Sequence, residues 1–154
     1  MATEPQILLL NGPNLNMLGQ REPAIYGTDT LAEIEQRCHA HADALGLALN
    51  FKQSNHEGEL VTWIQDANGV CDGLIINAGA YTHTSIALLD ALTLLDCPII
   101  ELHLSNVFAR EKFRHHSYIS PVATGVICGL GGHGYMLAMD AVKRLLDDLS
   151  LIHI

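Results

Sequence analysis

The chain has 154 residues, of which 49% are apolar, and its formal net charge at pH 7 is −9. This length fits one domain with a substantial core, so we expect residues 1–154 to form a single unit. The acidic balance disfavours nucleic-acid binding, because proteins that bind nucleic acids usually carry a basic face.

The sequence gives no indication of a membrane span or an export signal. No apolar run approaches the roughly 20 residues that cross a bilayer. The first residues, MATEPQ, lack the basic segment of a signal peptide. The cysteines have no CxxC spacing and lie in apolar contexts at Cys38, Cys71, Cys97 and Cys128. We therefore expect reduced thiols in the core of a cytoplasmic protein.

Five short apolar runs of strand length alternate with amphipathic segments along the chain. The predicted strands are Gln6–Asn11, Leu47–Gln53, Gly73–Asn77, Pro98–His103 and Thr124–Cys128. This alternation predicts an α/β fold in which a parallel sheet is covered by helices on both faces. With five strands, the expected order is the flavodoxin-like 2-1-3-4-5.

Capping residues and helical periodicity predict the helices. The first helix has a capping box from Thr30 to Glu33 and ends at Gly46. The last helix should cover about residues 134–149, and the apolar tail at residues 150–154 has no assigned role. The predicted N-caps of the two helices between are Ser54 or Asn55, and Thr84, with the Thr84 helix continuing through Leu95.

In a sheet of this order, ligands bind at the carboxyl ends of the strands, near the point where the strand order reverses. The segments that follow the first, third and fourth strands are NGPN, AGAYTHTS and HLSN. A long loop at about residues 17–29 follows NGPN and is bracketed by Gly19 and Gly27. Long loops of this kind are often functional, so we expect a lid over the site.

The fourth strand and the segment after it combine an acid–base pair with cations. Glu101 and His103 are two residues apart, so their side chains should share one face of a strand. A neighbouring carboxylate can fix the tautomer of an imidazole. Arg110, Lys112 and Arg114 follow, which are three of the chain's eight Lys and Arg residues. The pattern suggests a site for a small anion, or else a buried histidine with a structural partner.

The glycine-bracketed loop also contains Arg21 and Tyr26. A free tyrosine is a poor base at neutral pH, but an adjacent guanidinium favours the phenolate. A mobile loop could bring this pair over the site and exclude water. The alternative interpretation is a surface loop with an anchoring tyrosine.

Other kinds of site are less consistent with the sequence. The GxGxxG pattern at residues 129–134 lacks the following strand and acidic residue of a dinucleotide site, so we interpret it as a tight turn before a closely packed helix. Only His83, His103 and Glu101 could converge on a metal, and Glu101 is better used to orient His103, so no metal or cofactor is expected. A flavodoxin-like binding or signalling module and a metal hydrolase remain alternatives.

The motifs NGPN, REPAIYG, NAG, THTS and ELHLSN and the two arginines occur in this order, and with them the chain resembles the type II 3-dehydroquinate dehydratases. The resemblance covers about residues 6–146. It implies a hydro-lyase of the shikimate pathway, which makes aromatic amino acids, or of quinate breakdown. The implied reaction converts 3-dehydroquinate to 3-dehydroshikimate by anti elimination through an enolate, without metal or cofactor.

The resemblance also assigns catalytic roles. Tyr26 would be the base that removes the proton beside the ketone, and Arg21 would keep it ionised. Asn14 would hold a water that stabilises the enolate oxygen. His103 would protonate the departing hydroxyl, with Glu101 orienting its ring.

Further residues would bind substrate, order the lid or lie between subunits. Arg110 would help order the lid, and Asp90 matches a position supplied by a neighbouring subunit, since family members assemble as dodecamers of trimers. The chain departs from the family pattern at Leu89, at Phe108 and at residues 132–133. The residues expected to grip the substrate's carboxylate and hydroxyls are Asn77, His83, Leu104, Ser105 and Arg114.

Overall fold

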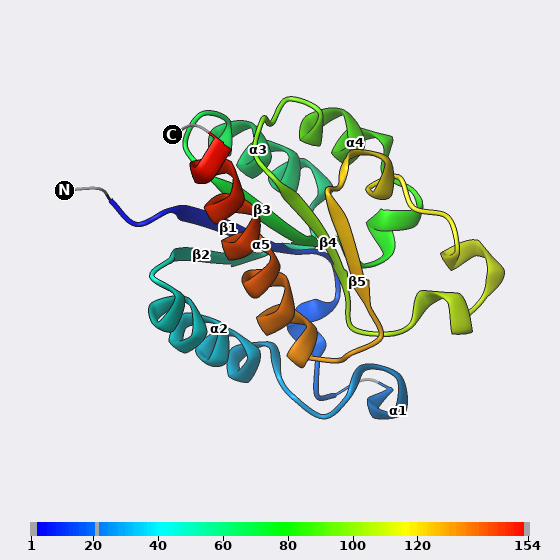
Figure 1. Ribbon diagram of the computed structural model, residues 1–154. Helices are drawn as coiled ribbons and strands as arrows, with labels where there is room; N and C mark the ends of the chain where they lie inside the picture. The colour runs from blue at the N-terminus through cyan, green and yellow to red at the C-terminus, as the bar shows by residue number, and fades with distance from the viewer. Residues whose placement is uncertain (1–2, 21, 153–154) are drawn as a thin grey trace.

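The computed structural model describes residues 3–20 and 22–152, and within them a five-stranded parallel sheet runs in the order β2-β1-β3-β4-β5 (Figure 1). The predicted fold class and strand order are therefore confirmed. Three strands begin one residue later than predicted. The strands are β1 (Gln6–Asn11), β2 (Ala48–Gln53), β3 (Gly73–Asn77), β4 (Ile99–His103) and β5 (Gly125–Cys128).

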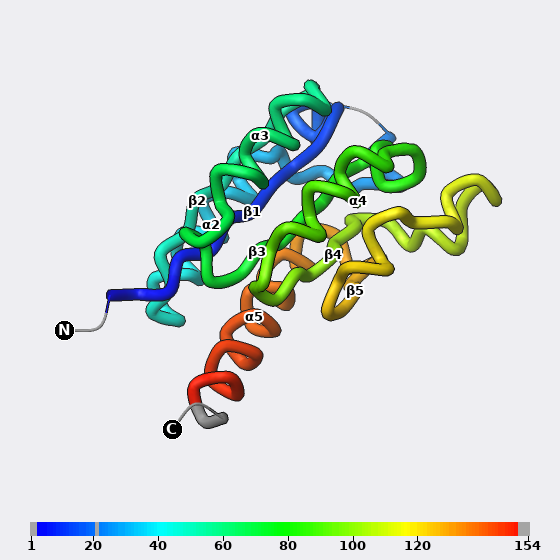
Figure 2. Tube along the Cα trace, turned by 90° about the horizontal axis from the view of Figure 1, so that it is seen from above, coloured from blue at the N-terminus to red at the C-terminus, as the bar shows by residue number. Residues whose placement is uncertain are grey.

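Two layers of helices enclose the sheet. Helices α2 and α5 cover one face, and α3 and α4 cover the other (Figures 1 and 2). None of the helices in the described part of the chain is long and apolar enough to cross a membrane. The helices are α1 (Pro23–Tyr26), α2 (Leu31–Leu45), α3 (Glu57–Ala67), α4 (Ile86–Leu92) and α5 (His133–Ile152). Short 3-10 turns occur at Leu15–Met17, Gly79–His83, Val107–Ala109, Lys112–Arg114 and Ser120–Val122.

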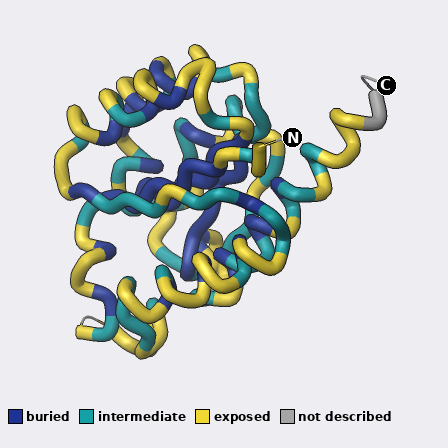
Figure 3. Tube along the Cα trace, turned by 90° about the vertical axis from the view of Figure 1, so that its left-hand side faces the viewer, coloured by how far each residue is buried: buried dark blue, intermediate teal, exposed yellow. Residues whose placement is uncertain are grey.

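Strand β1 shows how the two cores are formed. Successive side chains of a strand point to opposite faces, so Ile7 and Leu9 pack with α2 and α5 while Leu8 and Leu10 pack with α3 and α4. All four are buried, as are the strands at the centre of the molecule in Figure 3. A strand buried on both faces accounts for the uninterrupted apolar run in the sequence.

The capping box of α2 is confirmed, but two predicted helix N-caps are wrong. Thr30 accepts a hydrogen bond from the backbone N–H of Glu33. The N-cap of α3 is His56. Neither predicted residue caps the helix, because the Ser54 hydroxyl accepts the His56 N–H and the Asn55 side chain accepts the Asn14 N–H. Helix α4 is also capped one residue later than predicted.

The cap of α4 is Ser85, whose hydroxyl accepts the Leu88 N–H, and the helix ends at Leu92 instead of Leu95. Thr84 has ψ −22°, whereas Ser85 has the extended ψ of 98° that an N-cap needs. The predicted loop at residues 17–29 is also more ordered than a plain loop, since it contains α1.

The glycines of the GxGxxG pattern form the turn that the sequence predicts. Gly129 and Gly131 have φ of 89° and 60°, a region that favours glycine. A Cβ at Gly134 would lie 3.1 Å from the Leu102 side chain, so the start of α5 packs closely on β4. Among the cysteines, Cys38 is buried as predicted, but the other three are only half-buried.

Candidate active site

A cleft of about 180 Å³ lies at the carboxyl ends of β1, β3 and β4. These are the strand ends at which the strand order predicts ligand binding. Nine of the predicted site residues line the cleft: Asn14, Tyr26, Asn77, His83, His103, Leu104, Ser105, Arg110 and Arg114. The structure therefore brings together residues that are up to 100 positions apart in the chain.

Gly12 allows the loops after β1 and β3 to meet at this cleft. Its N–H donates to the carbonyl of Asn77 at 2.8 Å, and a Cβ at this position would clash with the carbonyl oxygen of Ala78. Asn14 follows with φ 67°, a left-handed conformation that asparagine tolerates. The Asn55 side chain accepts the Asn14 N–H at 3.0 Å and so fixes this turn.

Glu101 and His103 form a buried pair on β4, and their predicted common face is confirmed. Their side chains are 2% and 6% exposed, and His103 Nε2 lies 2.5 Å from Glu101 Oε2. Burial would raise the pKa of the Glu101 carboxyl. Hydrogen bonds from His103, Ser120 and Ser117 outweigh burial and hold this pKa below its ordinary value. Glu101 is therefore a carboxylate at neutral pH.

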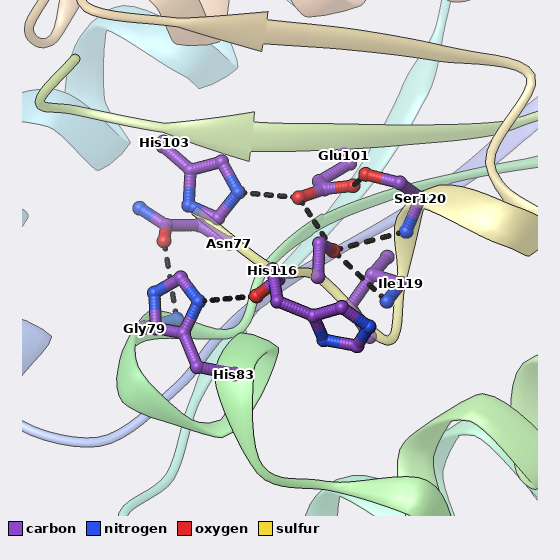
Figure 4. A network of polar contacts seen from close by, with 9 residues as sticks. Asn77, Gly79, His83, Glu101, His103, His116, Ile119 and Ser120 are labelled. Carbon is purple, nitrogen blue, oxygen red and sulfur yellow. Dashed lines mark hydrogen bonds and ion pairs between the residues drawn. The ribbon is translucent and has the colours of Figure 1, made fainter. Parts of the chain in front are cut away.

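The carboxylate determines which nitrogen of His103 carries a hydrogen. Nε2 faces an acceptor, so Nε2 is the protonated nitrogen of the neutral ring. The other ring nitrogen, Nδ1, points away from Glu101 on the side of Asn77 (Figure 4). Nδ1 is therefore the atom through which His103 can exchange a proton with a molecule in the cleft.

His83 stacks beside His103, with ring centroids 6.3 Å apart and planes 15° apart. Its Nδ1 donates to the backbone carbonyl of His116 at 2.8 Å (Figure 4). Burial lowers the pKa of His83, and the charges of His103 and Arg114 act in the same direction. A neutral His83 with Nδ1–H engaged has Nε2 free to accept a hydrogen bond from a ligand.

Asn77 is held by a buried chain of hydrogen bonds that the sequence analysis missed. Its Nδ2 donates to the Tyr135 hydroxyl at 3.0 Å, which donates to Asn11 Oδ1 at 2.7 Å. Asn77 Oδ1 accepts the Gly79 N–H. Burial raises the pKa of Tyr135, so its hydroxyl stays protonated. A tyrosine on the apolar face of the last helix was the available signal, because a buried phenol needs a polar partner.

Tyr26 ends α1 and reaches the cleft from the predicted lid. The guanidinium carbon of Arg110 lies 5.1 Å from the centroid of the Tyr26 ring, and Arg110 Nη1 lies 3.5 Å from Ser105 Oγ. This distance is typical of a cation–π contact, so Arg110 helps to hold the Tyr26 ring at the cleft. Arg21, the predicted partner of Tyr26, lies outside the described residues.

Arg114 adds a second cation to the cleft. Its Nε is 2.6 Å from the Glu111 carboxylate, which lies 4.0 Å from Arg110. The Arg114 hydrogen bond lowers the pKa of Glu111, so this exposed carboxylate is ionised beside both arginines. Glu111 therefore fixes the orientation of Arg114 at the mouth of the site.

Some residues singled out in the sequence do not line the cleft. Asp90 is exposed on α4, and Glu101 lies behind His103. Phe108 is 63% exposed, and Leu89 is half-buried on α4. Among residues 3–20 and 22–152, no three His, Cys, Asp or Glu side chains are grouped so that they could hold a metal ion.

Comparisons with known proteins agree on one family. The family model described as "Dehydroquinase class II" matches residues 5–143. The "3-dehydroquinate dehydratase 2" of Pseudomonas putida is 57% identical over 145 residues, covering 94% of this chain and 97% of that protein. The "Catabolic 3-dehydroquinase 1" of Neosartorya fischeri is 58% identical over 146 residues, covering 95% and 97%. The crystal structure of the type II dehydroquinase from Propionibacterium acnes has a TM-score of 0.89 at 44% identity, covering 94% of this chain and 99% of that one.

Proposed function

This chain belongs to the class II dehydroquinase family, and we propose that its cleft removes water from 3-dehydroquinate by anti elimination through an enolate. As a type II 3-dehydroquinate dehydratase, it is a hydro-lyase that yields 3-dehydroshikimate. The observation that carries the mechanism is that Tyr26 and His103 line one cleft, with the buried carboxylate of Glu101 against the His103 ring. The binding-module and metal-hydrolase alternatives are set aside, because the family match spans nearly the whole chain.

Tyr26 is the base. Its phenolate takes the proton from the carbon beside the ketone, and the C–H electrons move to the carbonyl to form an enolate. Arg21 is the guanidinium that keeps Tyr26 ionised in this proposal. Arg110, 5.1 Å from the centroid of the Tyr26 ring, helps to order the lid. Asn14 holds the water that hydrogen-bonds to the enolate oxygen.

His103 is the acid of the second step. Its imidazolium donates a proton from Nδ1 to the leaving hydroxyl while the enolate electrons form the C=C bond and the C–O bond breaks. Glu101, 2.5 Å from Nε2, stabilises the imidazolium and keeps Nδ1 directed at the cleft. Water leaves, and the proton held by Tyr26 returns to His103 through solvent, so no external acid is consumed.

The polar lining binds the substrate. Arg114 and the backbone N–H groups of Leu104 and Ser105 suit the carboxylate, since charge-assisted hydrogen bonds are the strong ones. Neutral His83 accepts from a hydroxyl, and Asn77 offers its remaining amide hydrogen.

In this proposal the protein assembles as a dodecamer built of trimers. The exposed Asp90 on α4 completes the site of a neighbouring subunit. Its place is the shikimate pathway. Shikimate biosynthesis and quinate catabolism both contain this dehydration, and one relative is named for the catabolic role. Size-exclusion chromatography with light scattering tests the assembly, and a monomer would contradict it.

The decisive experiment is an assay of purified protein on 3-dehydroquinate, followed by the ultraviolet absorbance of the conjugated enone product. Turnover should survive borohydride added with substrate, because the mechanism has no iminium that the reductant could trap. An intact protein that gives no enone would overturn the proposed activity, and inactivation by borohydride would overturn the enolate mechanism.

A further inference from the structure

Behind His103, the carboxylate of Glu101 is held by Ser117 and Ser120, two serines of the loop that precedes β5. Figure 4 labels Ser120 beside Glu101. Ser117 Oγ lies 2.9 Å from Glu101 Oε2, the same oxygen that His103 contacts. Ser120 Oγ lies 2.5 Å from the other oxygen, Oε1. A short O–H···O⁻ distance is typical of a hydroxyl that donates to a carboxylate. Each carboxylate oxygen of Glu101 is therefore within hydrogen-bond distance of a serine hydroxyl.

The direction of the Ser117 hydrogen bond follows from its other contacts. Ser117 Oγ accepts the backbone N–H groups of Ile119 and Ser120, both at 3.0 Å. A hydroxyl has two lone pairs and one hydrogen. With both lone pairs occupied, its hydrogen is available only for Glu101, so Ser117 acts as a donor to the carboxylate.

This pattern of donors favours the ionised form of Glu101. Oε2 accepts from His103 and Ser117, and Oε1 accepts from Ser120. A protonated carboxyl would have to direct its own hydrogen at one of these donors. The direction of the Glu101 pKa, below its ordinary value, agrees with the geometry.

The loop that supplies the serines is anchored independently of the cleft. Ile119, between the two serines, is fully buried in the core formed with α3 and α4. The neighbouring Tyr118 N–H donates to the Thr82 carbonyl at 2.9 Å. The same loop provides the His116 carbonyl that orients His83. The hydroxyls are thus held in place before any ligand binds.

We propose that Ser117 and Ser120 are positioning residues of the dehydration, which act through Glu101 to keep His103 oriented and protonated. This inference rests on the proposed function, in which His103 donates the proton to the leaving hydroxyl. Neither serine lines the 180 Å³ cleft, so neither is expected to touch the substrate.

Ser120→Ala is the decisive variant, because the hydrogen bond that Ser120 Oγ makes among the described residues is the one to Glu101. We expect kcat to fall about tenfold, the scale of one hydrogen bond to a charged group, while KM changes less than twofold. Losing a donor raises the pKa of Glu101 and weakens its support of the imidazolium. The midpoint of the acidic limb of the kcat–pH profile should therefore shift to higher pH and that of the alkaline limb to lower pH, so the profile should narrow.

Three controls separate positioning from structure. Ser120→Thr keeps a hydroxyl and should restore most of the rate. Ser54→Ala removes another buried serine hydroxyl, one that accepts a backbone N–H far from Glu101, and should leave the pH profile unchanged. In a Glu101→Gln background, Ser120→Ala should cost little further activity, because the serine acts through the carboxylate.

A folded Ser120→Ala enzyme with a normal kcat and pH profile would overturn the inference. So would a Ser120→Ala change that lowers kcat as much in the Glu101→Gln background as in the wild type. If Ser120→Ala does not fold, the conservative Ser120→Thr and the Ser117→Ala variant carry the test by the same profile. A wild-type protein that is inactive on 3-dehydroquinate would refute the proposed function instead, so the two failures are distinguishable.

Discussion

Two cavities lie at opposite ends of the same sheet, and they differ in what their polar groups do. The cleft at the carboxyl ends has a volume of about 180 Å³, whereas a cavity at the amino ends of β3 and β4 has about 350 Å³. The larger one is lined by turn residues before those strands, including Cys71 and Cys97, and by Leu146 and Leu149 of α5. Volume alone would therefore favour the amino-end cavity over the proposed site.

What distinguishes the smaller cleft is a set of buried polar side chains that converge on it. His103 and Asn77 are 6% and 3% exposed and still present polar atoms to its interior. At the amino end, the side chains of Cys71, Cys97 and Asp72 are engaged with one another or with the backbone. The sulfur atoms of Cys71 and Cys97 are 3.7 Å apart, and the Asp72 carboxylate accepts the Gln6 N–H at 2.7 Å. Convergent polar groups in a concave site are better evidence of function than volume.

The largest effect should come from removing either proton-transfer group at the carboxyl end. Tyr26→Phe removes the phenolate and His103→Ala removes the acid, so each should lower kcat by about 10²–10⁴-fold. Circular dichroism and thermal melting should show that both variants fold. A folded variant with near wild-type turnover would remove that residue from the mechanism.

A smaller loss is expected when the charge behind His103 is removed. Glu101→Gln keeps the shape of the side chain but loses the negative charge and turns an N–H toward hydroxyl or ring donors. We expect kcat to fall about ten- to a hundredfold, as for the loss of a hydrogen bond to a charged group. Steady-state kinetics measures this, with the Glu59→Gln variant on the exposed side of α3 as the matched change of another carboxylate. An unchanged kcat would mean that Glu101 is structural.

The same variant has a pH-dependent effect on stability. The pKa of Glu101 is lower in the folded protein than in an unfolded chain, so its ionised form adds stability above its ordinary pKa. That contribution is lost as pH falls through the folded-state pKa. Denaturant unfolding should therefore show a gap between wild type and Glu101→Gln that is widest near pH 7 and narrows toward pH 3. A gap that is constant with pH would show that ionisation is not the cause.

How far the site could be predicted depends on how local its contacts are. The Glu101–His103 pair follows from the two-residue repeat of a strand, so the sequence alone predicted it. Ser117 and Ser120 were missed because they lie 16 and 19 residues from Glu101 along an irregular loop. The path of that loop is set by burial of Ile119 in a core that no local pattern specifies.

The fold was more predictable than its details for a similar reason. Apolar runs and their spacing sufficed for the strand order, since parallel strands with short crossovers allow few topologies. The cap of α4 could not be chosen because Thr84 and Ser85 are both capping residue types. Backbone angles that depend on the preceding turn decided between them.

A further prediction concerns the buried support of the cleft. Tyr135→Phe leaves Asn77 Nδ2 and Asn11 Oδ1 without their hydroxyl partner. Unpaired buried polar groups should lower the free energy of unfolding by about 2 kcal/mol, and a less constrained Asn77 should raise KM severalfold. Tyr81→Phe, which removes a hydroxyl bonded to the Asn55 carbonyl, is the matched control and should change KM less. Equal effects of the two variants would contradict a special role for Tyr135.

The smallest effect should come from the amino-end cavity, and it tests the comparison directly. Cys97→Ala removes the thiol contact with Cys71 at the far end of β4 from His103. Because none of the catalytic groups in the described part of the chain contacts this cysteine, kcat and KM should stay within twofold of wild type, while the free energy of unfolding changes by about 1 kcal/mol. Kinetics and urea unfolding of the same preparation measure both quantities. If kcat fell severalfold while the fold was retained, the two ends of the sheet would be coupled, and activity would depend on packing along β4 as well as on the polar groups at its carboxyl end.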